Sequence, residues 1–373
     1  MRPTPARSPL AIALALLLPL GLAACDRAAT DAGSSATPVA AATAEERAAE
    51  TARLNAWFEE QFEEQLQSSP IRMTYLGRKD LYDQLDDVSD AGIQERLDWM
   101  QASVEEMEAG FDYDRLEPEA QLSWELWKKQ YERARDGMPF LLDGYAFNQM
   151  GGMHTMAPTF MINFHRVDDE SDYLAYVSRL RALPAVLDTL VERGRRSSAA
   201  GIHAPKFAHE GVIDQSRKVI SGAPFDDGAD SALWADAQAK ADALATAGTI
   251  TAARAEELKA DARAALLEDV KPAYERIIAF ATEELPTAAV NPAGVGSTHP
   301  DGAAYYAHQL AQNTSTAMTA DEIHELGLSE VARLRGELEK VQAEIGFEGD
   351  LQAFFRHVQS DPERLYPNTD AGR

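Results

Sequence analysis

Residues 54–66, LNAWFEEQFEEQL, place large apolar side chains three and four positions apart along the chain. The apolar positions are Leu54, Trp57, Phe58, Phe62 and Leu66. On an α-helix this spacing gathers them on one face, and the four glutamates between them fall largely outside it. The segment therefore predicts an amphipathic helix that packs against other helices through this face.

The same helical period recurs along most of the chain. It predicts further helices over 93–107, 116–135, 173–194, 231–247, 251–284 and from 320 to 345. Ser231 is placed to cap one of these helices, and Pro272 should kink or divide another because proline has no amide hydrogen. Thr319 and Glu322 form the pattern of a capping box. Hydrophobic residues make up 45% of the chain, which allows a sizeable core. We expect a mainly α, multi-helix fold.

Two long segments lack this period. Residues 138–167 mix aromatic side chains, glycine and asparagine with Pro158, and we expect a loop with one or two short strands there. Residues 285–302 are rich in proline and glycine and should also be irregular. Long irregular segments in a compact protein are often functional.

The N-terminus has the order of a bacterial lipoprotein signal. Arg2 and Arg7 precede an apolar run over 10–22, which Pro19 and Gly21 interrupt. Such a run is too short to span a bilayer, and its order is that of a signal peptide. Residues 22–25, LAAC, resemble a lipobox. We expect residues 1–24 to be removed and Cys25 to carry lipid; the alternative is an ordinary signal peptide with a coincidental cysteine.

This reading divides the chain into three parts. After the signal, residues 25–43 are rich in alanine, serine and threonine and should form a flexible tether. Residues 44–373 should form the helical domain. Cys25 is the only cysteine, so no internal disulfide can form. We expect membrane lipid, through acylated Cys25, as a partner, and a location in the bacterial envelope facing the periplasm or the exterior.

The charge excludes one class of function. The formal net charge is -26, and removal of Arg2 and Arg7 with the signal would make it -28. A surface this acidic repels nucleic acid and anionic lipid head groups. We therefore exclude nucleic-acid binding.

A search for catalytic motifs finds none. Two histidines, His209 and His324, are followed by glutamate, but a zinc-peptidase helix needs a second histidine four residues after the first. Those positions hold Ile213 and Leu328. No serine lies in a Gly-x-Ser-x-Gly elbow. We expect no catalytic residue and no metal ligand set in this chain.

One segment combines groups that could line a pocket. His299 precedes a Pro-Asp-Gly turn, and Tyr305 and Tyr306 follow it. These three residues are candidate pocket-lining residues. The alternative is that they are a helix entry whose aromatic rings pack in the core, which is the commoner role of such side chains.

Three stretches resemble a bacterial family called domain of unknown function 885. They are residues 147–152, residues 172–205, and residues 300–327 with their continuation to 346–350 and 366–367. The most specific is the third, PDGAAYY followed by TADEIHELG. The resemblance implies a helical architecture like that of gluzincin peptidases and, for full-length members, zinc and peptide hydrolysis.

The metal motif of such members resembles His-Glu-x-x-Pro-Gly-His, and this sequence does not contain it. Residues 366–370 have the pattern of a turn and a helix start near the chain's end. We therefore expect the N-terminal part of a larger, membrane-anchored, zinc-dependent peptidase-like lipoprotein, inactive as it stands. The alternative is a non-catalytic helical envelope lipoprotein that binds a peptide or protein partner. A third possibility is that exposed apolar stripes make the chain aggregate.

Overall fold

The computed structural model describes residues 42–373. The expected signal over 1–24, Cys25 and nearly all of the expected tether lie outside the described residues. Residues 44–373 form one unit by their contacts. The described residues are helices and connecting loops without a named strand, so the mainly α fold is confirmed. None of the helices in this part of the chain is long and apolar enough to cross a bilayer.

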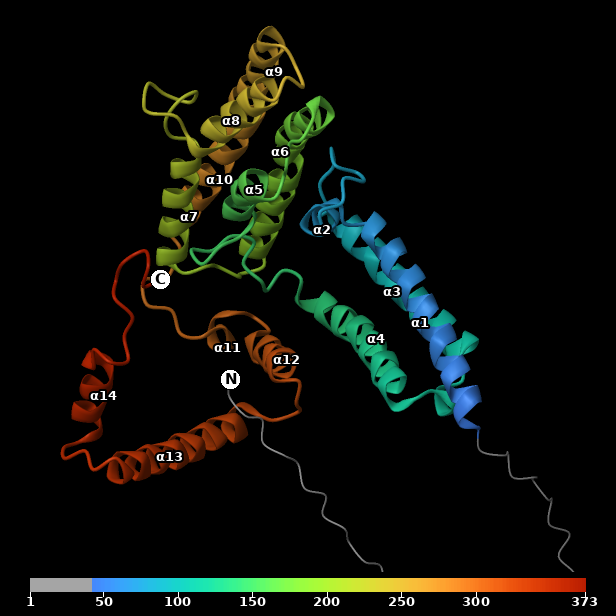
Figure 1. Ribbon diagram of the computed structural model, residues 1–373, viewed down its shortest axis with the longest axis vertical. Helices are drawn as coiled ribbons and strands as arrows, with labels where there is room; N and C mark the ends of the chain where they lie inside the picture. The colour runs from blue at the N-terminus through green and yellow to red at the C-terminus, as the bar shows by residue number, and fades with distance from the viewer. Residues whose placement is uncertain (1–41) are drawn as a thin grey trace, which may run out of the picture. The chain divides into compact units, whose positions relative to one another are not determined.

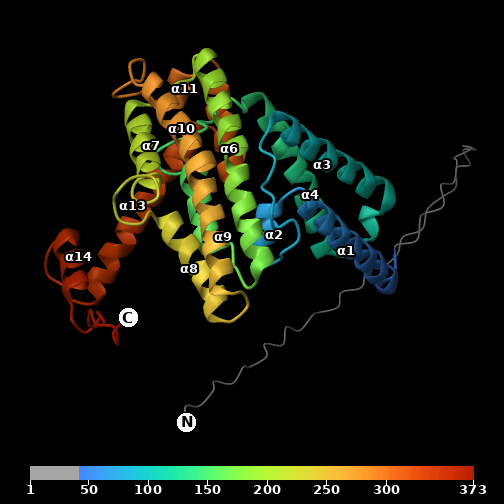
Figure 2. The same ribbon diagram turned by 90° about the horizontal axis from the view of Figure 1, so that it is seen from above.

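Six helices surround the larger of two hydrophobic cores (Figures 1 and 2). They are α5 (Met153–Asn163), α6 (Glu170–Ala199), α7 (Lys206–Val219), α8 (Ala232–Thr246), α9 (Ala252–Ala265) and α10 (Lys271–Glu284). Helix α10 packs against α6 and α7, and α8 packs against α9. Leu180, Leu258 and Ile277 are fully or almost fully buried where these helices meet. Burial of this kind of apolar surface is the main contribution to the stability of the bundle.

The N-terminal helices are α1 (Ala44–Gln67), α2 (Pro70–Tyr75), α3 (Asp90–Gly110), η1 (Tyr113–Arg115), α4 (Pro118–Gly137) and η2 (Met138–Phe140). Of these, α1, α3 and α4 surround a second, smaller core, and Ile71 of α2 packs against the larger one. Leu54 and Trp57 of α1 pack with Met107 of α3 and Trp124 of α4. The helix predicted from residues 54–66 and its inward face are therefore confirmed.

The predicted division at Pro272 is also confirmed. Helix α9 ends at Ala265, a short π-helical turn, η3 (Leu266–Val270), follows, and α10 begins at Lys271. Pro272 is thus the second residue of α10 and follows the π-helical turn directly, so the residue without an amide hydrogen lies where regular α-helical bonding is interrupted. Ser231 caps α8 as predicted, with its side chain accepting from the Trp234 amide.

The prediction for residues 138–167 was partly wrong, because they contain a helix and no named strand. Helix α5 runs through Pro158. Proline cannot donate to the carbonyl oxygen four residues earlier, which belongs to His154. The hydroxyl of Tyr274 donates to that oxygen instead, at 2.7 Å. A contact 120 positions away in sequence therefore compensates for the feature that suggested a loop. Residues 285–302 are irregular as predicted, apart from the short α11 (Val295–Thr298) before α12 (Gly302–Thr314).

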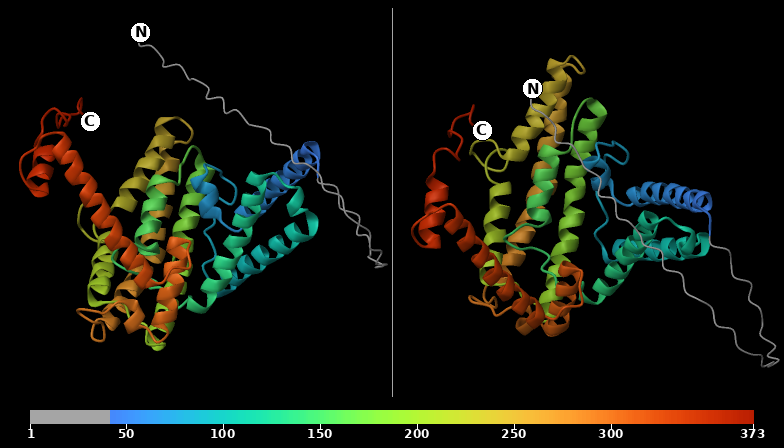
Figure 3. Two further views of the ribbon diagram at one scale, coloured as in Figure 1. Left: turned by 90° about the horizontal axis from the view of Figure 1, so that it is seen from below. Right: turned by 60° about the horizontal axis from the view of Figure 1, so that its bottom comes forward.

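Two helices follow at the C-terminal end, α13 (Ala320–Glu344) and α14 (Leu351–Ser360) (Figure 3). The capping box of α13 is confirmed, since Thr319 accepts from the Glu322 amide and the Glu322 side chain accepts from the Thr319 amide. The apolar side chains of α13 are nevertheless exposed. They are Leu326, Leu328, Val331, Leu334, Leu338 and Val341. We call this set the α13 apolar face.

Candidate functional site

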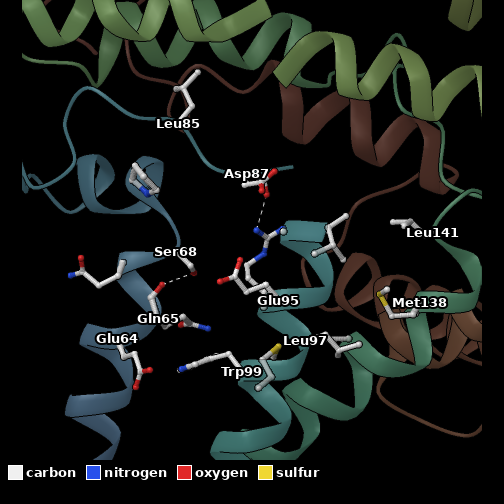
Figure 4. A pocket seen from close by; sticks show the side chains of 18 of the residues that line it. Glu64, Gln65, Ser68, Leu85, Asp87, Glu95, Leu97, Trp99, Met138 and Leu141 are labelled. Carbon is white, nitrogen blue, oxygen red and sulfur yellow. Dashed lines mark hydrogen bonds between the residues drawn. The ribbon is translucent and has the colours of Figure 1, made fainter. Parts of the chain in front are cut away.

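A cavity of about 740 Å³ lies among the N-terminal helices. Its walls come from the end of α1, the start of α2, residues 84–87, the first half of α3, the end of α4 and η2 (Figure 4). This volume is within the range of small-molecule and peptide sites in proteins. The cavity is therefore the candidate binding site.

One wall is fixed by hydrogen bonds between α2 and the chain that follows it. The Ser69 hydroxyl donates to one carboxylate oxygen of Asp86 at 2.7 Å. The backbone amide of Ile71 donates to the other oxygen at 2.9 Å. Because Asp86 lies between Leu85 and Asp87, these bonds hold two lining residues beside the start of α2.

Arg179 of α6 fixes the same wall from behind. It is fully buried and donates to the Gln84 carbonyl oxygen at 2.8 Å, the Thr74 hydroxyl at 2.8 Å and the Pro70 carbonyl oxygen at 3.3 Å. Its guanidinium also lies over the ring of Tyr82, 4.9 Å from the centroid. Burial lowers the pKa of Arg179 to about 10, so the group stays charged at neutral pH. Pro70 and Gln84 both line the cavity, and Arg179 therefore connects its wall to the main bundle.

A second part of the lining depends on how α3 begins. Ser89 caps α3, and Asp90 in the first turn binds Arg193 at 3.0 Å and Arg196 at 2.5 Å. The backbone amide of Ser89 donates to Asp87, which holds the pKa of that carboxyl below its usual range. A β-carbon at Gly92 would lie 2.6 Å from the Asp87 carboxyl carbon, so glycine is required for this approach.

The lining joins apolar surface to carboxylates. The apolar side chains are Leu85, Ile93, Leu97, Trp99, Met100, Ala134, Met138 and Leu141. Glu64, Asp87 and Glu95 contribute the carboxylates, and Arg96 is the basic lining residue. Gln65, Gln67, Ser68 and Gln84 add amide and hydroxyl groups. Such a lining can bind apolar groups and can hydrogen-bond to a polar backbone.

The structure brings two of the three predicted pocket residues together. The ring of His299 lies 5.7 Å from that of Tyr305 and 5.7 Å from that of Tyr145. His299 is 6% exposed and its Nε2 has no hydrogen-bond partner among the described residues. Tyr306 is 44% exposed. None of the three lines the cavity described above, and Cys25 lies outside the described residues.

The described residues do not fit a zinc ion. His203 Nδ1 lies 3.1 Å from Glu284 Oε2, and the same oxygen accepts from the Ser198 hydroxyl. Within residues 42–373, however, no group of three histidine, cysteine or acidic side chains is arranged to hold a metal. A zinc site needs three or more protein ligands that converge on one point.

The lining residues of the cavity were not predicted as a site. The stripe over 93–107 was identified, and its second half is buried, with Val104 at 7% and Met107 at 0% exposure. Ile93, Leu97 and Met100 are only half buried and line the cavity. Helical period shows which face turns inward, but it contains no information on the distance between two helices.

The family model described as bacterial protein of unknown function (DUF885) matches residues 70–373. The chain belongs to this family. No curated protein matches it. Among solved structures, this DUF885 chain is similar to one described as a "putative lipoprotein" from Colwellia psychrerythraea, with a TM-score of 0.71 and 18% sequence identity. The match covers 87% of this chain and 56% of the other, so the two share a fold, and this chain spans little more than half of the Colwellia chain.

Proposed function

We propose that this DUF885 protein is the peptide-binding part of a lipid-anchored, peptidase-like lipoprotein of the bacterial envelope. The observation that carries the proposal is the cavity of about 740 Å³, whose lining joins apolar side chains to carboxylate, amide and hydroxyl groups. The lipobox-like residues 22–25 and the lipoprotein described for the similar Colwellia structure support the envelope location.

A peptide suits the chemistry of the lining. Its side chains can enter the apolar region formed by Ile93, Leu97 and Trp99. Its backbone amides and carbonyls can pair with the side chains of Gln67 and Gln84, which make no side-chain hydrogen bond to the rest of residues 42–373. Unpaired amide groups beside apolar side chains are suited to an extended chain that has both kinds of surface.

Hydrolysis of the bound peptide is proposed only for longer family members. The metal motif expected for them is not in this sequence, and the described residues do not form a zinc site. We therefore assign no catalytic step to residues of this chain. The second candidate function, stoichiometric peptide binding without cleavage, uses the same cavity. To distinguish the two, peptides are incubated with the protein as its gene encodes it, with and without a chelator, and are then analysed by mass spectrometry. Peptides that are cut only without the chelator indicate hydrolysis, and peptides that stay intact in both samples indicate binding alone.

The binding proposal is tested by filling the cavity. Calorimetric titration of the full chain with a set of octapeptides of varied composition should detect binding. Ala134→Trp places a large ring where the end of α4 lines the cavity and should abolish it. The matched control is Leu126→Trp on the same helix, where the side chain is 54% exposed and lies outside the cavity. Equal peptide binding by both variants would show that the cavity is not the binding site.

The anchor is tested at Cys25. Cys25→Ser removes the sulfur that would carry lipid, and we expect the protein to move from the membrane fraction to the soluble fraction. Ser34→Cys in the same background is the matched control, because it restores a thiol at the wrong position and should not restore membrane association. Persistent membrane association of Cys25→Ser would contradict the lipid anchor.

A further inference from the structure

We propose that the cavity selects peptides in which lysine or arginine adjoins an apolar residue, with the carboxylates of Glu64 and Glu95 attracting the cationic group. This inference rests on the proposed peptide-binding function and names the class of peptide. Three observations carry it: the absence of partners for the two glutamate side chains within the described part of the chain, the apolar lining residues beside Glu95, and the balance of charge in the lining.

Glu64 and Glu95 come from different helices and are both free to bind. Glu64 lies near the end of α1 and Glu95 in the first half of α3 (Figure 4). Both side chains are exposed, and within residues 42–373 neither takes part in a hydrogen bond or an ion pair. Most of the acidic residues of α1 and α3 lie outside the cavity, but these two are in its lining. They are therefore the carboxylates that an incoming cation would meet without displacing an existing partner.

The third carboxylate is already engaged and shapes the wall. Asp87 accepts from the Ser89 amide at 2.8 Å. The Asp87 backbone carbonyl oxygen accepts from the Arg96 guanidinium at 2.7 Å. Asp87 therefore adds negative charge to the cavity, but its position is already fixed by its hydrogen bonds at the start of α3.

Apolar lining residues lie beside Glu95 along α3. Trp99 is one helical turn after Glu95, and Ile93 and Leu97 are within two residues of it. Lysine and arginine carry long aliphatic stems that pack on apolar surface while the charged end stays in a polar environment. An indole ring adds attraction for a cation when the cation approaches its face. A basic side chain next to an apolar one thus matches both parts of the lining.

The balance of charge favours the same ligand. Three carboxylates line the cavity, and the basic lining residue, Arg96, is held by the Asp87 carbonyl. The whole chain carries a formal charge of -26. This field draws cationic ligands to the surface and disfavours acidic peptides. Neutral apolar peptides can contact the apolar lining residues but do not pair with the carboxylates.

The test compares three octapeptides that differ at one position, which holds lysine, norleucine or glutamate beside a leucine. Calorimetry on the full chain should give the lysine peptide the tightest binding, about fivefold over the norleucine peptide, with the glutamate peptide weakest. The lysine advantage should shrink as salt is raised, since exposed charges are screened.

The variants distinguish the effect of Glu64 and Glu95 from that of the negative charge of the whole chain. Glu64→Gln with Glu95→Gln should remove about fivefold of the affinity for the lysine peptide and leave the norleucine peptide unchanged. The matched control is Glu60→Gln with Glu106→Gln, which removes the same charge from the same two helices outside the cavity. An equal loss in both double variants would overturn the role of Glu64 and Glu95.

The outcomes distinguish this inference from the function on which it rests. Equal affinity for the lysine and norleucine peptides, with binding still abolished by Ala134→Trp, would overturn the charge preference and leave peptide binding intact. Tightest binding of the glutamate peptide would also overturn it. Absence of binding by all three peptides and by the wider octapeptide set would remove both proposals.

Discussion

The Tyr274 hydroxyl donates a hydrogen bond of 2.7 Å to the main-chain carbonyl oxygen of His154. That oxygen lacks its usual helical donor because Pro158 occupies the position four residues later. Burial raises the pKa of the Tyr274 phenol, so the hydroxyl remains a donor throughout the ordinary pH range. One side chain of α10 thus allows proline inside α5.

Tyr274→Phe should lower the free energy of unfolding by about 1–3 kcal/mol, because it leaves a buried carbonyl oxygen without a donor. Urea unfolding followed by circular dichroism measures the change. In a Pro158→Ala background the residue at 158 regains its amide hydrogen, and the cost of Tyr274→Phe should fall. Equal costs in the two backgrounds would show that the hydroxyl does not compensate for the proline.

Arg179→Met should destabilise the protein by at least about 3 kcal/mol, because several buried acceptors lose a charged donor. Since Arg179 holds Pro70 and Gln84 at the cavity wall, peptide affinity should fall as well. Arg179→Lys keeps the charge but not the forked geometry, and we expect it to recover only part of each loss. The matched control is Arg181→Met on the exposed side of α6. Its stability and its peptide affinity should both stay near those of the wild type. Unchanged peptide affinity in folded Arg179→Met would contradict the role at the cavity.

Stability should fall as the solution becomes acidic between about pH 6 and pH 4.5. Burial and the charge of the Arg179 guanidinium beside it together lower the pKa of His165 to about 3. Burial also lowers the pKa of His154 and His209. These groups are neutral in the folded protein but gain protons on unfolding below their ordinary pKa of 6.5. Their contribution is thus fully present above that value and is lost below it, and that of His165 is lost as the pH falls towards 3.

His165→Gln should reduce this pH dependence by about 1.4 kcal/mol per pH unit, the value for one proton. Urea unfolding at a series of pH values from 6 to 4.5 measures the slope. His324→Gln, on the exposed surface of α13, is the control and should keep the wild-type slope. The same slope in His165→Gln as in the wild type would show that His165 is not the group that gains the proton.

The α13 apolar face should bind hydrophobic dyes and promote self-association, because side chains such as Val331 and Val341 are 66% and 46% exposed. Val331→Gln with Val341→Gln should lower both signals in dye fluorescence and light scattering. The free energy of unfolding should change by less than about 0.5 kcal/mol, since little buried surface is lost. Val104→Gln is the contrasting control, because Val104 is 7% exposed and its replacement should destabilise the protein. A large loss of stability in the α13 variant would mean that this face is packed in solution.

Local chemistry made much of the helical architecture predictable. The period over 54–66, the cap at Ser231, the break at Pro272 and the capping box at Thr319 depend on neighbours within one or two turns. A sequence records such interactions directly, because the partners are a few positions apart.

Helix α5 and the cavity depend on partners that are distant in sequence. The Tyr274 hydroxyl reaches the carbonyl oxygen that Pro158 leaves without a helical donor. Arg179 holds Gln84, 95 positions away, at the cavity wall. Helical period placed Ile93 and Leu97 on an inward face, but whether that face is filled or hollow depends on how far apart the packed helices stand. That distance is set by side-chain packing over the whole domain, and the tertiary structure alone contains it.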